Sequence, residues 1–371
     1  MSKVSWGASG GDGKRSPLLG FVPYHELDGR PNVVVDGSPT EGTVLCLTHW
    51  PGIASPAEFR ADLSAQMAFA YLEAYDRHHP AAAVSNNHFD QDGLVSLYAL
   101  ARPEAALARR DLLIDVARAG DFATFERREA ARISMALSAY ATPGRSPLDG
   151  LAADYAVMTG QLYSELLGRL DELCAHPDRY RYLWAEEDAS LEASEAALAM
   201  GRATIEEVMD IDLAVVTVGK NAPRAGGHRF AGEWVFGLHP MSICNATDRF
   251  ALLVIREQSY EFTYRYETWV QYQSRRPRLR VDLSALAERL NSDERGPGRW
   301  IAGPVSGLTP TLRLDGAEQS DISPRCFRTA VQDYLRNAQP AWDPYAPGGG
   351  KIPAGPGRTA GPDGRAERVS A

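Results

Sequence analysis

The stretch VSNNHFDQDGLVSLYAL, residues 84–100, joins the end of a strand to the start of a helix. Residues 81–90 begin as an apolar, strand-like run, and residues 92–101 continue with the apolar spacing of a helix. One histidine and two aspartates, His88, Asp90 and Asp92, stand at alternate positions between them. The pattern predicts a polar cluster where a strand ends and a helix begins.

The same succession occurs once upstream. GTVLCLTHW, residues 42–50, is an apolar run with a polar end, and residues 56–75 follow with helical spacing. NVVVD, residues 32–36, is a further short strand, which we interpret as an edge strand. Strand and helix alternating at this spacing predict a parallel sheet.

The character of the chain changes near Asp210, from helical to strand-rich. We therefore expect an α/β protein, with an N-terminal parallel-sheet domain containing many helices and a smaller C-terminal α+β domain. The expected parts are a flexible N-terminus (1–20), the α/β domain with its helical segment (21–209), the strand-rich domain (210–338) and a disordered Pro/Gly-rich tail (339–371).

The composition favours a globular protein. A net charge of -9 argues against a broad grip on long nucleic acid. The arginine-rich run at residues 274–280 has two interpretations, a local basic groove or a solvated strand end.

The chain contains neither zinc-type cysteine pairs nor a membrane anchor. Four cysteines lie far apart without C-x-x-C spacing, so we expect them to be reduced and mostly buried. The first twenty residues lack the apolar core of a signal peptide, and no stretch is long enough to span a bilayer. We expect a cytoplasmic protein without membrane contact, and the sequence leaves its oligomeric state open.

Two hypotheses explain His88, Asp90 and Asp92. On an extended segment, alternate side chains point to one side, and imidazole with carboxylates suits Mn²⁺ or a similar divalent ion. In the other interpretation, Asp92 caps the next helix, Asn86 and Asn87 bond within a turn, and His88 is an ordinary polar side chain.

The run from His88 to Ser96 resembles the first motif of the DHH phosphoesterases, a histidine and an aromatic residue followed by D-x-D-G. That superfamily includes nucleases, oligoribonucleases, cyclic-dinucleotide phosphodiesterases and pyrophosphatases. The resemblance implies a site for one or two Mn²⁺ ions between a parallel-sheet domain and a smaller C-terminal domain, with His88, Asp90 and Asp92 as ligands. The whole chain also resembles an uncharacterised bacterial family.

Other parts of the superfamily pattern are partial here. ARAGDF, residues 117–122, offers Asp121 as a counterpart of a later metal aspartate, or as a helix-end surface residue. The defining D-H-H triplet is absent downstream of the first motif. His49, at the end of the preceding strand, is either its substitute or a turn residue.

Two glycine-rich segments loosely resemble the substrate loop of the superfamily. They are residues 224–232, with Gly226, Gly227 and His228, and residues 296–303, with Gly298 and Arg299. Glycines let backbone N–H groups approach an anion, although both segments are equally compatible with plain connections between strands.

The sequence thus leads us to expect a metal-dependent hydrolase of phosphate esters or anhydrides, acting on nucleotides or short oligonucleotides. The absent triplet leaves a second function open, a nucleotide- or metal-binding sensor or assembly protein without catalysis. A third is a different metal-dependent chemistry at the same site.

Overall fold

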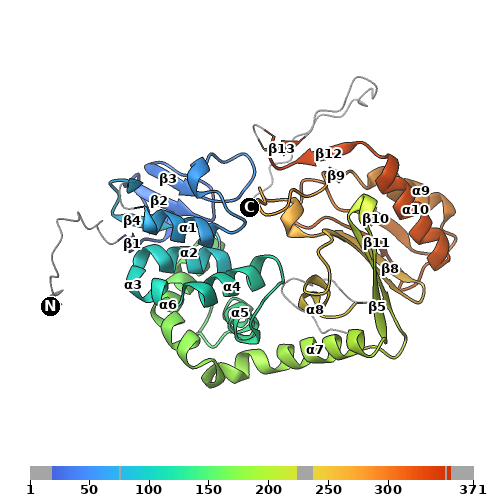
Figure 1. The fold of residues 1–371 in the computed structure, drawn as a ribbon, viewed down its shortest axis with the longest axis horizontal. Helices are drawn as coiled ribbons and strands as arrows, with labels where there is room; N and C mark the ends of the chain where they lie inside the picture. The colour runs from blue at the N-terminus through green and yellow to red at the C-terminus, as the bar shows by residue number, and fades with distance from the viewer. Residues whose placement is uncertain (1–18, 75–76, 224–236, 347–348, 352–371) are drawn as a thin grey trace.

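The computed structural model describes residues 19–74, 77–223, 237–346 and 349–351, and it consists of a helix-rich half and a strand-rich half (Figure 1). This confirms the expected α/β class. The helices of the first half are α1 (Ser64–Glu73), α2 (Gln91–Ala101), α3 (Pro103–Ala108), α4 (Arg110–Asp121), α5 (Arg128–Tyr140), α6 (Tyr155–Ala175) and α7 (Arg181–Ala199). Those of the second are α8 (Pro240–Cys244), α9 (Ser284–Asp293) and α10 (Pro324–Asn337).

The first sheet is parallel, as predicted. Its strands are β1 (Gly20–Phe21), β2 (Asn32–Val35), β3 (Thr43–Leu47) and β4 (Ala83–Ser85), in the order β1-β4-β2-β3. The edge position expected for residues 32–36 is wrong, because β2 pairs with both β3 and β4. Its three valines are fully buried, which is typical of an inner strand covered on both faces.

Helix α2 lies at the centre of the helix-rich half. Every residue from Gln91 to Leu100 is buried, and the helix packs against α1, α4 and the strands of the parallel sheet. This explains why the sequence from 93 to 101 is small and apolar on all sides rather than amphipathic.

The second sheet is mixed. Its strands are β5 (Ala203–Val208), β6 (Leu213–Val218), β7 (Ala251–Arg256), β8 (Ser259–Tyr264), β10 (Arg299–Ala302) and β11 (Thr311–Asp315), in the order β10-β11-β8-β7-β6-β5. Alternate residues of β6 and β7 enter two different cores, so Leu213 faces α9 and α10 while Ala214 faces the helix-rich half.

The strand-rich region begins slightly before the predicted change at Asp210. Strand β5 starts at Ala203 and pairs along its length with β6. Helix α7 ends four residues earlier, and Figure 1 shows it running beneath the molecule from the helical region to this sheet. One long helix therefore joins the two halves.

The start of the predicted tail is ordered, which corrects the expectation of disorder from residue 339. Strand β12 (Pro340–Asp343) pairs with β9 (Arg280–Val281) and with β13 (Gly350–Lys351) in a small third sheet. The side chain of Trp342 is buried, and the apolar area it removes from water outweighs the local Pro and Gly content. Residues 352–371 lie outside the described residues, as do 1–18.

The arginine-rich run mostly makes contacts within the protein. Arg275 pairs with Asp212, Arg278 donates to the Asp210 and Leu335 carbonyls, and Arg280 is fully buried. This favours a structural role over a basic groove for those three arginines.

All four cysteines are free thiols, and Cys46, Cys174 and Cys244 are buried, as expected. Among the helices in the described part of the chain, none combines the length and apolar character required to cross a bilayer.

Candidate metal centre

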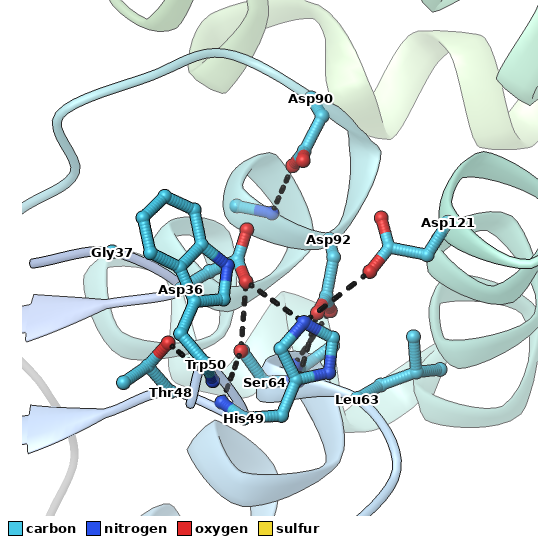
Figure 2. Close-up of polar contacts among 12 residues, drawn as sticks. Asp36, Gly37, Thr48, His49, Trp50, Leu63, Ser64, Asp90, Asp92 and Asp121 are labelled. Atoms are coloured by element: carbon cyan, nitrogen blue, oxygen red, sulfur yellow. Dashed lines mark hydrogen bonds and ion pairs between the residues drawn. The ribbon is translucent and has the colours of Figure 1, made fainter. Parts of the chain in front are cut away.

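Acidic and imidazole side chains follow three neighbouring strands of the parallel sheet. Asp36 comes directly after β2, His49 follows β3, and His88 and Asp90 follow β4. Carboxyl ends of parallel strands share one edge of a sheet, so these residues meet there. Figure 2 shows Asp36, His49 and Asp90 of this set, with Asp92 and Asp121 beside them. The helices supply the last two: Asp92 lies in the first turn of α2 and Asp121 ends α4.

Asp36 joins two overlapping groups. Its Oδ1 is 3.5 Å from His49 Nε2, and its Oδ2 is 3.4 Å from His88 Nε2. The first group also contains Asp92, and Asp121 Oδ2 lies 3.6 Å from His49 Nε2. In the second group, His88 Nε2 is 2.9 Å from Asp90 Oδ2.

The spacing and chemistry of these atoms fit a divalent cation. Adjacent ligands of an octahedral ion with bonds near 2.1 Å lie about 3 Å apart. Asp36 Oδ2 and His49 Nε2 are buried acceptors without a hydrogen-bond partner among the described residues. A buried acceptor left unpaired is costly, and a bound cation would satisfy both atoms.

A backbone carbonyl fixes the orientation of His49. Its Nδ1 lies 2.5 Å from the carbonyl oxygen of Asp62, which can only accept a hydrogen bond. The proton must therefore be on Nδ1, and Nε2 turns an unprotonated lone pair toward Asp36. Burial lowers the pKa of His49 to about 4, which keeps the ring neutral. By contrast, His88 Nδ1 has no hydrogen-bond partner among the described residues.

The start of α1 supports two of the carboxylates. Asp92 accepts from the backbone N–H groups of Ser64 (2.8 Å) and Ala65 (2.7 Å), where the helix dipole favours negative charge. The Ser64 hydroxyl donates to Asp36 Oδ1 at 2.8 Å. Each oxygen keeps a second lone pair, so these bonds leave metal binding open.

Burial and mutual repulsion raise the pKa of the inner carboxyls. Burial raises the pKa of Asp36 well above its usual value, and the charges of Asp90, Asp92 and Asp121 raise it further. Burial, followed by the charge of Asp90, raises the pKa of Asp92 to about 7. A nearby cation would reverse this, because opposite charge favours the ionised form.

The D-x-D-G sequence has a structural reason at each position. Asp90 is the N-cap of α2, and its Oδ1 accepts from Gly93 N at 2.8 Å. A Cβ on Gly93 would lie 2.3 Å from Asn86 Nδ2 and 2.4 Å from the Tyr163 hydroxyl, so only glycine fits. That hydroxyl donates to the His88 carbonyl and holds the turn.

The structure brings together all five residues for which the sequence suggested a metal role: His49, His88, Asp90, Asp92 and Asp121. The sequence pattern placed His88, Asp90 and Asp92 on one extended segment with their side chains on the same side, and this geometry was wrong in part. Asp92 is helical rather than extended, and it joins a different group from His88 and Asp90. The residue that caps the helix is Asp90 rather than Asp92. Its Oδ1 makes the capping hydrogen bond of the turn hypothesis, and its Oδ2 lies beside His88, as the metal hypothesis requires.

The predicted substrate residues Gly298 and Arg299 lie at the wrong end of their strand. They stand at the start of β10, where Arg299 is exposed and pairs in register with Asp315. The other end leads into the 303–310 loop, where the Ser306 carbonyl accepts from Trp269 Nε1. Strand β10 separates the two ends by about 10 Å. Gly226, Gly227 and His228 lie outside the described residues.

Sequence reasoning missed Asp36, the residue shared by both groups. It was counted only as the last letter of an edge strand, although an aspartate before a glycine at a strand end is a usable signal. Asp36 has a positive φ of 47°, and the following Gly37 passes so close to Asn87 that a Cβ would lie 2.2 Å from its Oδ1. Asparagine and aspartate tolerate that backbone region better than most residues.

Aromatic side chains from both halves cover the cluster. Tyr266 packs edge-on against His49 at 5.8 Å, and Trp50 lies 5.1 Å from the His88 ring. Trp269 contacts both Trp50 and Tyr266. His88 and Asp90 keep 19% and 12% of their side-chain area exposed, whereas His49 has none, so the cluster opens toward His88 and Asp90.

A family model covers most of the chain, from residue 18 to residue 346, and it is described as "Family of unknown function (DUF6687)". The chain belongs to this family. The match agrees with the expected resemblance to an uncharacterised family. No curated protein and no solved structure matches the chain. The DUF6687 match provides no link to the DHH phosphoesterases, so the resemblance of residues 88–96 to that superfamily stays a prediction.

Proposed function

We propose that this protein is a divalent-metal-dependent hydrolase of phosphate esters or anhydrides. The observation that carries the proposal is a pair of buried acceptors, Asp36 Oδ2 and His49 Nε2, that make no hydrogen bond among the described residues. They lie within a set of two histidines and four aspartates. We propose Mn²⁺ as the ion, because mixed imidazole and carboxylate ligands suit it. The bound metal would lower the pKa of a water molecule and stabilise charge at the attacked phosphorus.

The buried residues of the cluster and the partly exposed ones have different roles in this proposal. His49 and Asp36 are buried and would anchor the metal, with Asp36 offering one oxygen to each group. His88 and Asp90 stand at the open side, where substrate would approach. We propose a nucleotide or short oligonucleotide as substrate, since a net charge of -9 disfavours long nucleic acid.

One observation favours a second candidate, a metal- or nucleotide-binding sensor without catalysis. Both oxygens of Asp92 accept backbone hydrogen bonds from the start of α1. Part of the acidic cluster therefore also serves the fold, and a metal held there would order α1 against α2. Bound Mn²⁺ without turnover of any phosphoester would favour this function.

The test is a hydrolysis assay on chelator-treated protein with and without Mn²⁺, using mononucleotides, dinucleotides and short oligonucleotides. We expect Mn²⁺-dependent release of phosphate or mononucleotide, lowered at least a hundredfold in His88→Ala. Arg299→Ala is the matched control and should keep full activity, because it lies on the far end of β10. Absence of turnover by Mn²⁺-loaded protein on every substrate would contradict the hydrolase.

A further inference from the structure

The indole N–H of Trp50 is buried beside the metal centre and has no hydrogen-bond partner among the described residues. Trp50 follows His49 in the chain, and its ring lies 5.1 Å from that of His88. In Figure 2 the indole is drawn on the same side of the cluster as Asp36, and no hydrogen bond joins Trp50 Nε1 to that carboxylate. The indole N–H is therefore an unused donor, as Asn86 Nδ2 also is, in a place where Asp36 Oδ2 and His49 Nε2 are unused acceptors.

A cation alone does not account for this donor. A cation can satisfy Asp36 Oδ2 and His49 Nε2, which offer lone pairs, but it cannot accept a hydrogen bond from the indole N–H. An indole only donates, so Trp50 requires an oxygen with a lone pair directed toward it. A water bound to a cation turns its hydrogens outward and has one lone pair left, whereas a phosphate oxygen carries negative charge and keeps lone pairs available in several directions.

The neighbouring tryptophan provides a contrast. Trp269 Nε1 donates to the Ser306 carbonyl at 3.1 Å, so its N–H is used within the fold. Its ring packs edge-on against Trp50 at 5.5 Å. The Trp50 ring packs against both Trp269 and His88, and these contacts restrict its rotation before any ligand arrives.

We propose that Trp50 Nε1 donates a hydrogen bond to an oxygen of a phosphate group bound at the metal centre. Trp50 is then a substrate-binding residue, and the centre accepts a cation together with an oxyanion. This inference rests on the proposed function, since it assigns a partner to the phosphoryl group.

The test compares Trp50→Phe with the matched control Trp269→Phe. Phenylalanine keeps an aromatic ring at the position but is smaller than the indole and lacks its N–H, so the same change at Trp269 controls for the loss of size. Titration calorimetry with inorganic phosphate on Mn²⁺-loaded protein should show at least tenfold weaker binding for Trp50→Phe, as expected for a hydrogen bond to a charged group. Trp269→Phe should stay within about twofold of the parent, and Mn²⁺ affinity without phosphate should be unchanged in both variants.

A second measurement uses the unmodified protein. In a ¹H–¹⁵N spectrum of Mg²⁺-loaded protein, phosphate should shift the indole signal that is missing from the Trp50→Phe spectrum. An unmoved signal, equal phosphate affinity in Trp50→Phe, or a parent that binds no phosphate would overturn the inference.

The two proposals fail separately. Phosphate bound through Trp50 without turnover of any phosphoester leaves this inference standing and contradicts the hydrolase. Mn²⁺-dependent hydrolysis together with unchanged phosphate affinity in Trp50→Phe supports the hydrolase and contradicts the role of Trp50.

Discussion

Asp90 uses its two oxygens for different tasks. Oδ1 caps α2 through Gly93 N, and Oδ2 lies 2.9 Å from His88 Nε2. Asparagine is as good an N-cap as aspartate, while alanine is much poorer. Two substitutions at this position therefore separate the structural task from the metal task.

In Asp90→Asn the cap stays and one negative charge disappears. With chelator, the variant should melt at the same or a higher temperature than the parent, because repulsion among the carboxylates falls. With Mn²⁺ at a hundredfold its dissociation constant, it should lack the parent's stabilisation of about 2.7 kcal/mol. Thermal melts in both buffers check this.

Asp90→Ala is the control for the cap and should lose about 1 kcal/mol with chelator. Equal destabilisation of Asp90→Asn in both buffers would favour the turn hypothesis instead.

The raised pKa values of Asp36 and Asp92 predict how stability depends on pH. In the metal-free protein both carboxyls keep their protons above the unfolded value of about 4. The contribution of Asp92 is lost as pH rises through about 7, and the raised pKa of Asp36 acts in the same direction. The pKa of His49 is lowered to about 4, so its contribution to stability increases with pH instead. This increase is complete above the unfolded value near 6.5.

Between pH 6.5 and pH 8, the melting temperature with chelator should therefore fall. The stabilisation by Mn²⁺ should grow over the same interval, because the metal binds the ionised carboxylates. Melts at four pH values test this, and a Mn²⁺ effect that is constant across the interval would contradict it.

At the scale of elements, the sequence pattern predicted whether a segment is a strand or a helix better than it predicted which elements lie beside it. The strand-to-helix passage at residues 84–100 is local, and the structure places β4 and α2 there. The position of β2 between β3 and β4 depends on pairing with residues about fifty positions away, which no local pattern contains. For the same reason Asp36 was not recognised as a partner of His88.

Strand β12 was missed because the Pro and Gly content of residues 339–371 led us to predict disorder there. Trp342 is buried under Gly350, where a Cβ would lie 2.3 Å from the indole. Tyr345 also donates to the carbonyl of Tyr272, close to the aromatic cover of the metal centre. Gly349 and Gly350, at the start of β13, have positive φ values of 95° and 78°, which glycine adopts without strain.

Ending the chain after Ala338 should lower the free energy of unfolding by roughly 3 kcal/mol, the cost of losing a buried tryptophan. Trp342→Ala in the full chain should have a similar effect. A chain ending after Lys351 is the control and should unfold like the parent, because a polar Pro/Gly-rich end buries little apolar surface. Denaturant unfolding measures all three, and an unaffected Trp342→Ala would show that the sheet adds no stability.

At the scale of the whole molecule, the two halves meet at the metal centre. The Asp62 carboxylate accepts from the backbone N–H groups of Gln273 (2.6 Å) and Ser274 (2.8 Å), while the Asp62 carbonyl orients His49. Gln271 N donates to the His49 carbonyl at 2.8 Å. The C-terminal half therefore helps to hold a residue that the N-terminal half supplies.

The sequence predicted two unlike halves and singled out five of the six clustered side chains. It could not predict which loop of the second half approaches the site, because that depends on how β10 and β11 are placed in the mixed sheet. The prediction of Gly298 and Arg299 rested on the loose resemblance of their glycine-rich segment to the substrate loop of the superfamily. The strand direction brings the opposite end of β10 to Trp269.

The most direct test of the account is titration of chelator-treated protein with Mn²⁺, followed by metal analysis of the parent and of Asp36→Asn. Asp36 contributes to both groups, and asparagine keeps its shape while removing its charge. We predict one or two ions per parent chain and a loss of affinity of at least a hundredfold in Asp36→Asn. A parent that binds no Mn²⁺, or a variant that binds it with the parent's affinity, would contradict the metal centre.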